Sequence, residues 1–392
     1  MKKCIAIVMM LIFSSVAFLN NVSASEMIEG GDDSVASSIS LDIKAKSAIL
    51  MEAKTGKILY EQNANESLPP ASITKIMTLL LVMEALEEGK IKETDLVTIS
   101  EYAASMGGSQ VFLAAGEEFS VRELLKCTVI ASANDAAVAL AEYTYGSENA
   151  FVEAMNQRAK ALGLAGSKFE NVTGLDDATV NHLTSAKDIA IMSQLLIKYP
   201  QIREFSSTWM DSIREGEFTL TNTNRLVRYY AGTIGLKTGS TEKAKFCLSA
   251  VAEREGMQLI AVIMGADSRD IRNSEAMRLL DYGFANYSIY EHIEENLEDL
   301  YVLKGEKDFI GVYADSFCAI VAKGKKDKVT YKIMLPNSIS SGISQNDEVG
   351  TITYVLDGET IGIAKVRAKE TVKTITFGKM LKKMLQTFLH LN

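Results

Sequence analysis

The chain has 392 residues, of which 47% are hydrophobic and 23% charged, as is typical of a globular protein long enough for two domains. Its formal net charge of −9 argues against a nucleic-acid-binding protein, because such proteins concentrate Lys and Arg on one surface. Only three histidines are present and no Cys/His spacing resembles a zinc site, so we expect no metal, no other cofactor and no Ser-His-Asp mechanism.

The first 24 residues have the pattern of a secretory signal peptide. Lys2 and Lys3 precede an apolar run from Cys4 to Leu19, and Ser23-Ala24 provides small residues for cleavage. An uncleaved anchor helix is the alternative, but the run is short for a membrane span. We therefore expect export, with the loss of Lys2 and Lys3 taking the formal charge from −9 to −11. The remaining cysteines are an odd, sparse set that does not suggest a disulfide framework: Cys127, Cys247 and Cys318.

Residues 25–42 are rich in Ser, Asp, Gly and Glu, and we expect a flexible linker there. Residues 43–286 predict a first domain with strands at both ends and helices between them. The predicted strands are a hairpin over 47–60 and single strands over 233–238, 245–252 and 258–265. The predicted helices cover 72–88, 121–130, 135–143 with Asp135 as its cap, 149–162, 184–196 and 269–284. This order predicts a sheet built from both ends of the domain, with an inserted helical lobe.

Residues 287–372 predict a small second domain made only of strands. Short apolar runs occur at 301–303, 318–322 and 329–334, and a hairpin is expected across Asp357-Gly358. An Asp-Gly pair with apolar flanks is typical of a type I′ hairpin turn.

Residues 373–392 contain four lysines and no acid. Large apolar residues recur there at helical spacing on one face: Phe377, Met380, Leu381, Met384, Leu385, Phe388 and Leu389. A basic amphipathic helix that is too polar to span a bilayer suits the surface of an anionic membrane. The alternative is an ordinary helix that docks on the preceding domain.

Ser72-Ile73-Thr74-Lys75 places a hydroxyl and an amine one turn apart at the start of an apolar helix. Residues at i and i+3 share a helix face, so the two groups lie within hydrogen-bond reach. A lysine can take the proton of a serine nucleophile when burial or another cation lowers its pKa. Ser240-Thr241-Glu242-Lys243 has the same spacing, and a serine that caps a helix is the alternative reading, so spacing alone does not decide.

Two tripeptides follow in order, Ser132-Ala133-Asn134 between two predicted helices and Lys237-Thr238-Gly239 at the end of a predicted strand. Each tripeptide also has a structural interpretation without a function. The first could be a polar turn between helices, and the second a solvated strand end. Similar tripeptides occur elsewhere in the chain. Only the motifs at Ser72, Ser132 and Lys237 combine the right order with the right context, which is a helix for the first, a helix–helix loop for the second and a strand for the third.

In this order, the three motifs resemble those of the penicillin-recognising serine acyltransferases. Longer segments look like the low-molecular-weight D-alanyl-D-alanine carboxypeptidases, at residues 107–110, 131–136, 171–175 and 235–239. The resemblance runs from about residue 43 to 285, and more loosely to the end of the chain. It implies an α/β (α+β) catalytic domain with an antiparallel sheet, helices on both faces and a helical lobe. A small all-β domain and the amphipathic helix would follow.

The chemistry of these groups and the resemblance imply their roles. We expect Ser72 to attack the carbonyl between two D-alanines, Lys75 to act as base, and Ser132 to relay a proton to the leaving amine. Lys237 would be a second cation that keeps Lys75 neutral and attracts a carboxylate. The other predicted substrate-binding residues are Asn134 for an amide, Thr238 for the terminal carboxylate, Gly239, Ser240 whose N–H would complete the oxyanion hole with that of Ser72, and Arg272, where the local match is weak.

The expected function is removal of the last D-alanine from peptidoglycan pentapeptides, at the outer face of the cytoplasmic membrane. A D,D-endopeptidase, a β-lactamase and a non-catalytic cell-wall binding module are the alternatives. Class A β-lactamases carry Glu-x-x-Leu-Asn, and the nearest segment here, 217–221, ends in Thr221 where asparagine is required. We therefore expect β-lactams to inhibit the protein rather than be destroyed by it. Cys247, on the strand after Lys237, is interpreted as a small buried hydrophobic residue.

Overall fold

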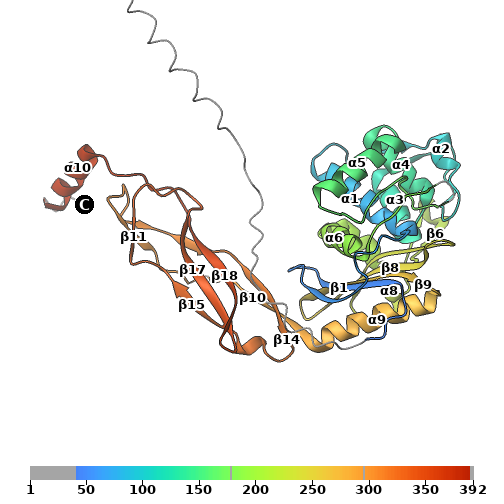
Figure 1. Ribbon diagram of the computed structural model, residues 1–392. Helices are drawn as coiled ribbons and strands as arrows, with labels where there is room; N and C mark the ends of the chain where they lie inside the picture. The colour runs from blue at the N-terminus through green and yellow to red at the C-terminus, as the bar shows by residue number, and fades with distance from the viewer. Residues whose placement is uncertain (1–40, 177–178, 295, 389–392) are drawn as a thin grey trace, which may run out of the picture. The chain divides into compact units, whose positions relative to one another are not determined.

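The computed structural model describes residues 41–176, 179–294 and 296–388, so the predicted signal peptide and most of the predicted linker lie outside the described residues. Residues up to 286 are built on one five-stranded sheet with strand order β2-β1-β9-β8-β7 (Figure 1). All neighbouring strands are antiparallel, and strands from both ends of this part pair at β1 and β9, as the sequence predicted. The strands are β1 (Ser47–Glu52), β2 (Ile58–Gln62), β7 (Thr233–Thr241), β8 (Lys245–Arg254) and β9 (Met257–Ala266).

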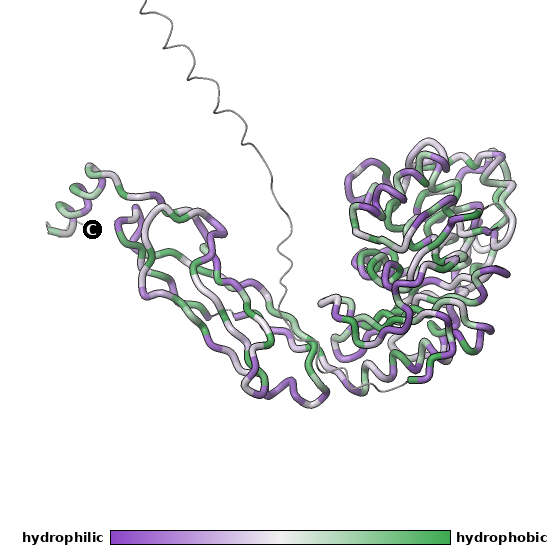
Figure 2. Tube along the Cα trace, in the orientation of Figure 1, coloured by the Kyte–Doolittle hydropathy of each residue, from purple (hydrophilic) through white to green (hydrophobic). Residues whose placement is uncertain are grey.

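The sheet is covered on both faces, so its central strands are apolar on both sides. In β1, Ile49 and Met51 pack into the core of the helical lobe, whereas Ala48 and Leu50 pack into the core that contains α9 (Arg269–Asn286). A strand buried on both faces needs a continuous apolar run rather than an alternating one. Figure 2 shows such hydrophobic stretches along the central strands. The predicted helices on both faces are therefore confirmed.

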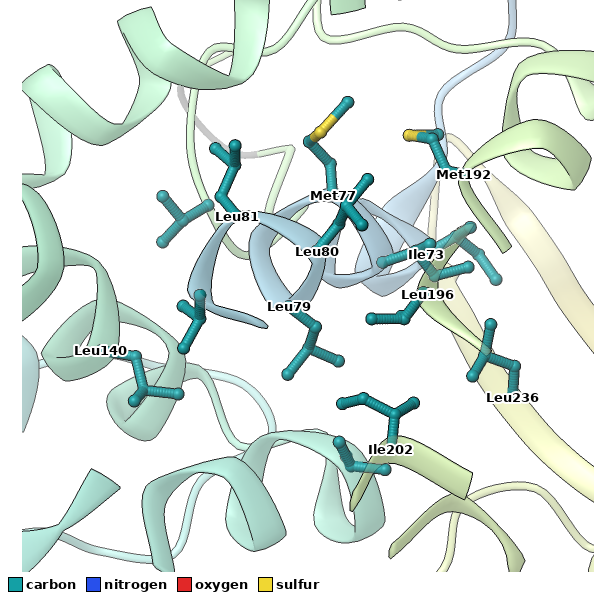
Figure 3. Packing of buried hydrophobic residues seen from close by; sticks show 14 of the residues in the cluster. Ile73, Met77, Leu79, Leu80, Leu81, Leu140, Met192, Leu196, Ile202 and Leu236 are labelled. Atoms are coloured by element: carbon teal, nitrogen blue, oxygen red, sulfur yellow. The ribbon is translucent and has the colours of Figure 1, made fainter. Parts of the chain in front are cut away.

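The helical lobe is organised around α1 (Lys75–Glu87), which is buried on nearly every side. Leu79 and Leu80 lie among side chains from other helices, including Leu140 and Ile202 (Figure 3). The other helices of this part are α2 (Glu101–Ala104), α3 (Val121–Lys126), α4 (Asn134–Tyr145), α5 (Glu148–Ala161), α6 (Ala186–Leu196), α7 (Pro200–Ser207) and α8 (Leu226–Tyr229). Two small hairpins complete it, β3 (Leu96–Thr98) with β4 (Glu118–Ser120) and β5 (Met210–Ile213) with β6 (Phe218–Thr221).

The structure corrects three local expectations. The predicted helix over 121–130 is α3 followed by a π-helical turn, Cys127–Ala131. The helix expected from Ser72 starts with a 3-10 turn, Ala71–Thr74, and becomes α-helical at Lys75. Asp135 was expected to cap α4, but the cap position is Ala133 and the Asp135 carboxylate accepts hydrogen bonds mainly from a different loop.

The described residues after 286 form strands only, apart from a short 3-10 turn and the last helix, as predicted. They make a four-stranded sheet, β13-β18-β17-β15, a three-stranded sheet, β12-β11-β16, and a pair, β10-β14, around their own apolar core. The hairpin expected at Asp357-Gly358 joins β17 to β18. The strands are β10 (Tyr287–His292), β11 (Leu300–Leu303), β12 (Phe309–Ile310), β13 (Val312–Ala314), β14 (Phe317–Ala322), β15 (Thr330–Met334), β16 (Ser338–Ser340), β17 (Glu348–Leu356) and β18 (Glu359–Ala368).

The chain continues into α10 (Phe377–Phe388), which is amphipathic as predicted. Its apolar residues are exposed, with Phe377 75% and Phe388 84% accessible. Within the described residues, none of the helices combines the length and apolarity required of a membrane span.

Candidate active site

Ser72 and Lys75 meet as the spacing predicted. Ser72 lies in the 3-10 turn, and Lys75, the first residue of α1, has its Nζ atom 3.1 Å from Ser72 Oγ. The Lys75 amine also donates to Asn134 Oδ1 at 2.5 Å and to the Thr173 carbonyl at 2.9 Å. A neutral amine has two N–H donors and one lone pair. Because the other two acceptors take both N–H groups, the lone pair of a neutral Lys75 points at the Ser72 hydroxyl.

The surroundings of Lys75 favour its neutral form. Its side chain is completely buried at the base of the apolar helix α1. Burial, and then the positive charge of Lys237, hold the pKa of Lys75 well below its usual value, while Asp135 acts in the opposite direction. No carboxylate of the described residues forms an ion pair with it. This lysine can therefore accept a proton from Ser72.

Ser132 is presented by an irregular backbone. The π-helical turn ends at Ser132, which has a left-handed conformation with φ +62°. Such strain in a residue other than glycine costs roughly 1–3 kcal/mol and is common at functional sites. The Ser132 side chain is buried and accepts a 2.6 Å hydrogen bond from Lys237 Nζ. A second Ser–Lys pair thus stands in the same cleft.

Lys237 occupies the buried middle of β7 and also donates to the Thr238 carbonyl at 2.9 Å. Burial, and then the nearby Arg272, lower the pKa of Lys237 to about 7. Gly239 brings β7 against the 3-10 turn Ala71–Thr74, because a Cβ atom at this glycine would lie 3.0 Å from the backbone nitrogen of Ser72. The backbone of β7 therefore lies in close contact with the backbone of the turn that contains Ser72.

Asn134 ties the site to the 107–113 loop. Its amide nitrogen donates to the Gly107 carbonyl at 2.7 Å, and its backbone N–H to the Ser109 carbonyl at 2.7 Å. The buried Asp135 carboxylate accepts from the backbone N–H groups of Val111 and Leu113. Sequence reasoning assigned Asp135 a different task, since only the fold brings that loop to it.

A second loop, Asn171–Leu175, also contacts the amine of Lys75. Thr173 supplies the carbonyl that Lys75 bonds, and Asn171 Oδ1 accepts from the N–H of Gly174 at 2.7 Å. The loop contacts the turn that contains Ser72 directly, because a Cβ atom at Gly174 would lie 1.8 Å from the Ala71 carbonyl oxygen. The motif resemblance included this segment, but nothing in the sequence indicated that its backbone would contact the lysine.

The cleft at these groups has a volume of about 580 Å³. It is lined by Ser72, Ser109, Ser132, Trp209, Thr221, Asn222, Thr223, Arg225, Tyr229, Thr238, Gly239, Ser240, Arg269 and Arg272. The structure thus brings every predicted site residue to the cleft or, for Lys75, Asn134 and Lys237, directly behind its serines. The sequence analysis did not identify eight of these lining residues as part of the site: Ser109, Trp209, Thr221, Asn222, Thr223, Arg225, Tyr229 and Arg269.

Arg272, which the family resemblance implied, lines the cleft beside β8. Its side chain is buried and bonds Asn273 Oδ1 and, at 3.5 Å, the Cys247 carbonyl. Burial, and then Arg269, lower the pKa of Arg272 to about 10. Cys247 is fully buried, and burial raises the pKa of its thiol to about 11, consistent with a packing role.

No Asp or Glu of the described residues lines the cleft. Glu217 follows a short turn before β6, and Asn222 uses its amide to bond the carbonyls of Ser206 and Thr208. The segment that most resembled a β-lactamase element therefore supplies no carboxylate beside Ser72.

Comparison with known proteins gives one consistent result. The family model of D-alanyl-D-alanine carboxypeptidases matches residues 33–268, and that of the penicillin-binding protein 5 C-terminal domain matches residues 284–374. The chain is 45% identical to the D-alanyl-D-alanine carboxypeptidase DacF of Bacillus subtilis, over 87% of this chain and 89% of that protein. It is 33% identical to DacA of Escherichia coli, over 89% and 86% respectively.

Solved structures agree. Penicillin-binding protein 5 of Haemophilus influenzae matches with a TM-score of 0.73 and 31% identity, over 84% of this chain and 98% of that one. Penicillin-binding protein D2 of Listeria monocytogenes, solved in an ampicillin-bound form, matches with a TM-score of 0.57 and 30% identity, over 62% of this chain and 99% of that one.

Proposed function

We propose how this cleft works from the premise that the chain belongs to the D-alanyl-D-alanine carboxypeptidase family and is an enzyme of that class in peptidoglycan metabolism. Lys75 takes the proton of Ser72, and Ser72 Oγ attacks the carbonyl carbon between the last two D-alanines. The peptide C–N bond breaks, an acyl-serine ester forms, and the proton passes through Ser132 to the leaving amine. Water then hydrolyses the ester and regenerates Ser72.

The binding roles follow from position and charge. Lys237, Thr238 and Arg272 bind the terminal carboxylate, because Thr238 and Arg272 line the cleft with Ser72 and the Lys237 amine lies directly behind Ser132. Asn134 holds a substrate amide. The N–H groups of Ser72 and Ser240 stabilise the oxyanion, an assignment supported by the close approach of Gly239 to the Ser72 turn.

β-Lactams are inhibitors under this proposal. They acylate Ser72 like a substrate, and deacylation is then slow because the described lining of the cleft offers no carboxylate to activate water. A relative with the same fold has been solved with ampicillin bound.

The observation that carries the proposal is the buried Lys75 amine 3.1 Å from Ser72 Oγ, without a carboxylate partner among the described residues. The test is to measure D-alanine released from a peptidoglycan pentapeptide and covalent labelling by a fluorescent penicillin. Ser72→Ala should abolish both, whereas Ser240→Ala should keep labelling, because only the backbone of Ser240 is assigned a role. Labelling of Ser72→Ala at the wild-type rate would overturn the proposal.

The domain plan and location belong to the same proposal. We assign residues 1–24 to a signal peptide, 25–42 to a linker, 43–286 to the catalytic domain, 287–372 to the β domain and 373–392 to a membrane anchor. The exposed apolar residues and the lysines of α10 support attachment to the outer face of the cytoplasmic membrane. Peptidoglycan stem peptides would be reached from there.

A further inference from the structure

His182 is a buried histidine that the proposed mechanism does not use. Its side chain is only 6% exposed, and it is not among the residues that line the serine cleft. The ring packs edge-to-face against Phe169, with the two centroids 5.8 Å apart. Because a buried imidazole needs a partner at each ring nitrogen, the partners of His182 indicate what this side chain does.

The two ring nitrogens of His182 have different partners. Nδ1 lies 3.0 Å from the backbone nitrogen of Glu170, whose N–H can only donate, so Nδ1 is the acceptor. Nε2 lies 2.7 Å from Oγ1 of Thr74. The Thr74 hydroxyl donates its single proton to the Ala71 carbonyl at 2.9 Å, so Nε2 carries the hydrogen and donates to Thr74. Burial lowers the pKa of His182 to about 4, and the ring is therefore neutral at neutral pH, as these contacts require.

The hydrogen bond from Nε2 ends on the 3-10 turn that contains Ser72. The Thr74 hydroxyl closes this turn onto the Ala71 carbonyl, and Ser72 lies between the two residues. Ala71 has a φ of +50°, which is in the left-handed region and costs free energy in a residue other than glycine. Such a conformation persists only where surrounding contacts hold it. His182 supplies one of these contacts from 108 residues away in the sequence.

The hydrogen bond to Nδ1 reaches the segment that contacts Lys75. Glu170 directly precedes the loop Asn171–Leu175, and the Thr173 carbonyl of that loop accepts a hydrogen bond from the Lys75 amine. One neutral imidazole therefore connects the turn of the proposed nucleophile with the segment that leads into the loop of the proposed base.

We propose that His182 is a positioning residue for acylation, because its Nε2–H holds Thr74 and thereby the turn in which Ser72 Oγ faces the Lys75 amine. His182 does not reach the cleft, so it acts through Thr74 and not on the substrate. This inference rests on the proposed roles of Ser72 and Lys75, and adds the group that fixes their geometry. Without the Nε2 bond, the turn relaxes and Ser72 Oγ moves away from the amine.

Two substitutions separate the functions of the two ring nitrogens. The amide of asparagine lies near the Nδ1 position of histidine, and that of glutamine near the Nε2 position. His182→Asn thus keeps an acceptor for the Glu170 N–H, whereas His182→Gln keeps a donor for Thr74. The measurements are the rate constant for acylation of Ser72 by a saturating fluorescent penicillin and the Kd of the complex that precedes it.

We expect His182→Asn to lower the acylation rate constant by about a hundredfold, because a small displacement of a reacting group has an effect of this size. The Kd should change little, since the displaced group reacts with the ligand but does not bind it. His182→Gln should keep most of the wild-type rate constant. A lower rate in His182→Gln than in His182→Asn would overturn the proposal, because the bond to Glu170 would then be the important one.

Thr74→Val removes the other partner of the same hydrogen bond with little change in shape, so it tests the proposal even if His182→Asn does not fold. It should lower the acylation rate constant to a similar degree. Because both changes break one interaction, the double variant His182→Asn, Thr74→Val should be no slower than the slower single variant. Losses that multiply in the double variant would show that the two residues act independently, and would overturn the proposal.

Thr184→Val is the matched control, because Thr184 is a buried threonine two residues from His182 whose hydroxyl bonds Ser167 and not the turn. It should lose stability in urea and keep the wild-type acylation rate constant. A loss of acylation as large as that of His182→Asn would mean that the rate follows stability, and would overturn the proposal.

The result also separates this inference from the mechanism on which it rests. Acylation of His182→Asn at the wild-type rate would overturn the positioning role and leave the roles of Ser72 and Lys75 standing. Failure of the wild-type protein to become labelled would overturn the proposed mechanism, and the role of His182 with it.

Discussion

The Nζ atom of Lys237 lies 2.6 Å from Oγ of Ser132, and both side chains are buried. Because the pKa of Lys237 is about 7, its charge is lost as the pH rises above neutrality, and the substrate carboxylate then loses a cation. We expect kcat/KM for the pentapeptide to fall on the alkaline side. Lys237→Arg keeps its charge at high pH, so it should retain partial activity without that alkaline limb. If kcat/KM of Lys237→Arg still fell at high pH as it does in the wild type, the titrating group would be a residue other than Lys237.

Lys75→Arg tests whether the lysine of the Ser72–Lys75 pair must be neutral, whereas Lys237 must be charged. Lys75 must become neutral to take the Ser72 proton, and a guanidinium does not deprotonate in the working range. We expect D-alanine release to fall by roughly a thousandfold, within the range of general-base catalysis. Rates of penicillin acylation should fall with it. If Lys75→Arg and Lys237→Arg lost activity equally, the two lysines would not have separate tasks.

Asp135→Asn should change both stability and the pH profile. One amide oxygen cannot accept every hydrogen bond that the carboxylate accepts from Val111, Leu113 and Ala136, so we expect a loss of about 1–3 kcal/mol in unfolding free energy. Asp135 raises the pKa of Lys75, so its removal lowers that pKa further. The neutral base then persists to lower pH, and the acidic limb of kcat/KM should move down.

Asp188→Asn is the control for Asp135→Asn. Asp188 is also buried, and it bonds Gly166 and Ser167 rather than a loop of the cleft. We expect a comparable loss of stability by urea denaturation with no movement of the acidic limb. A shift of the limb in both variants would mean that it follows stability and not the charge beside Lys75.

The hydrogen bonds that Asp135 accepts from the 107–113 loop illustrate what could not be predicted from the sequence. The Ser72–Lys75 contact follows from helix geometry within four residues, and was predicted correctly. Periodicity likewise identified the strands on both sides of the inserted lobe. The hydrogen bonds from the Val111 N–H to Asp135 and from the Lys75 amine to the Thr173 carbonyl join segments 24 and 98 residues apart, and only the folded chain brings them together. Such long-range contacts leave no local pattern.

Gly174→Ala should be far more damaging than a matched glycine change. Gly174 has φ +82°, and a Cβ atom there would lie 1.8 Å from the Ala71 carbonyl oxygen. Gly163 has a similar φ of +70° with open space around it. We expect a loss of about 1 kcal/mol for Gly163→Ala and more than about 3 kcal/mol for Gly174→Ala. D-alanine release should fall only in Gly174→Ala, because the Thr173 carbonyl that accepts a hydrogen bond from Lys75 must then shift. Equal losses by urea denaturation would contradict the close approach.

Removal of residues 373–392 should release an active enzyme from the membrane. The exposed apolar face of α10 from Phe377 to Phe388 supplies the attraction, since each buried methylene contributes ~0.8 kcal/mol. Vesicle sedimentation with anionic lipid should show binding of the exported full-length protein and loss of binding after truncation. Turnover of a soluble pentapeptide should stay the same. Reversing the charges of Lys379, Lys382 and Lys383 should weaken binding and remove its salt sensitivity.

The docking alternative makes a different prediction, because Lys379 and Lys383 form ion pairs with Glu306 and Asp308 in the structure. These pairs are exposed, and such pairs stabilise a fold by at most about 1 kcal/mol. Glu306→Gln with Asp308→Asn should therefore leave stability nearly unchanged, and should leave vesicle binding intact because all lysines remain. If that double variant or the truncation instead unfolded residues 287–372, α10 would be part of the β domain core. The apolar face of α10 would then pack against the β domain rather than bind a bilayer.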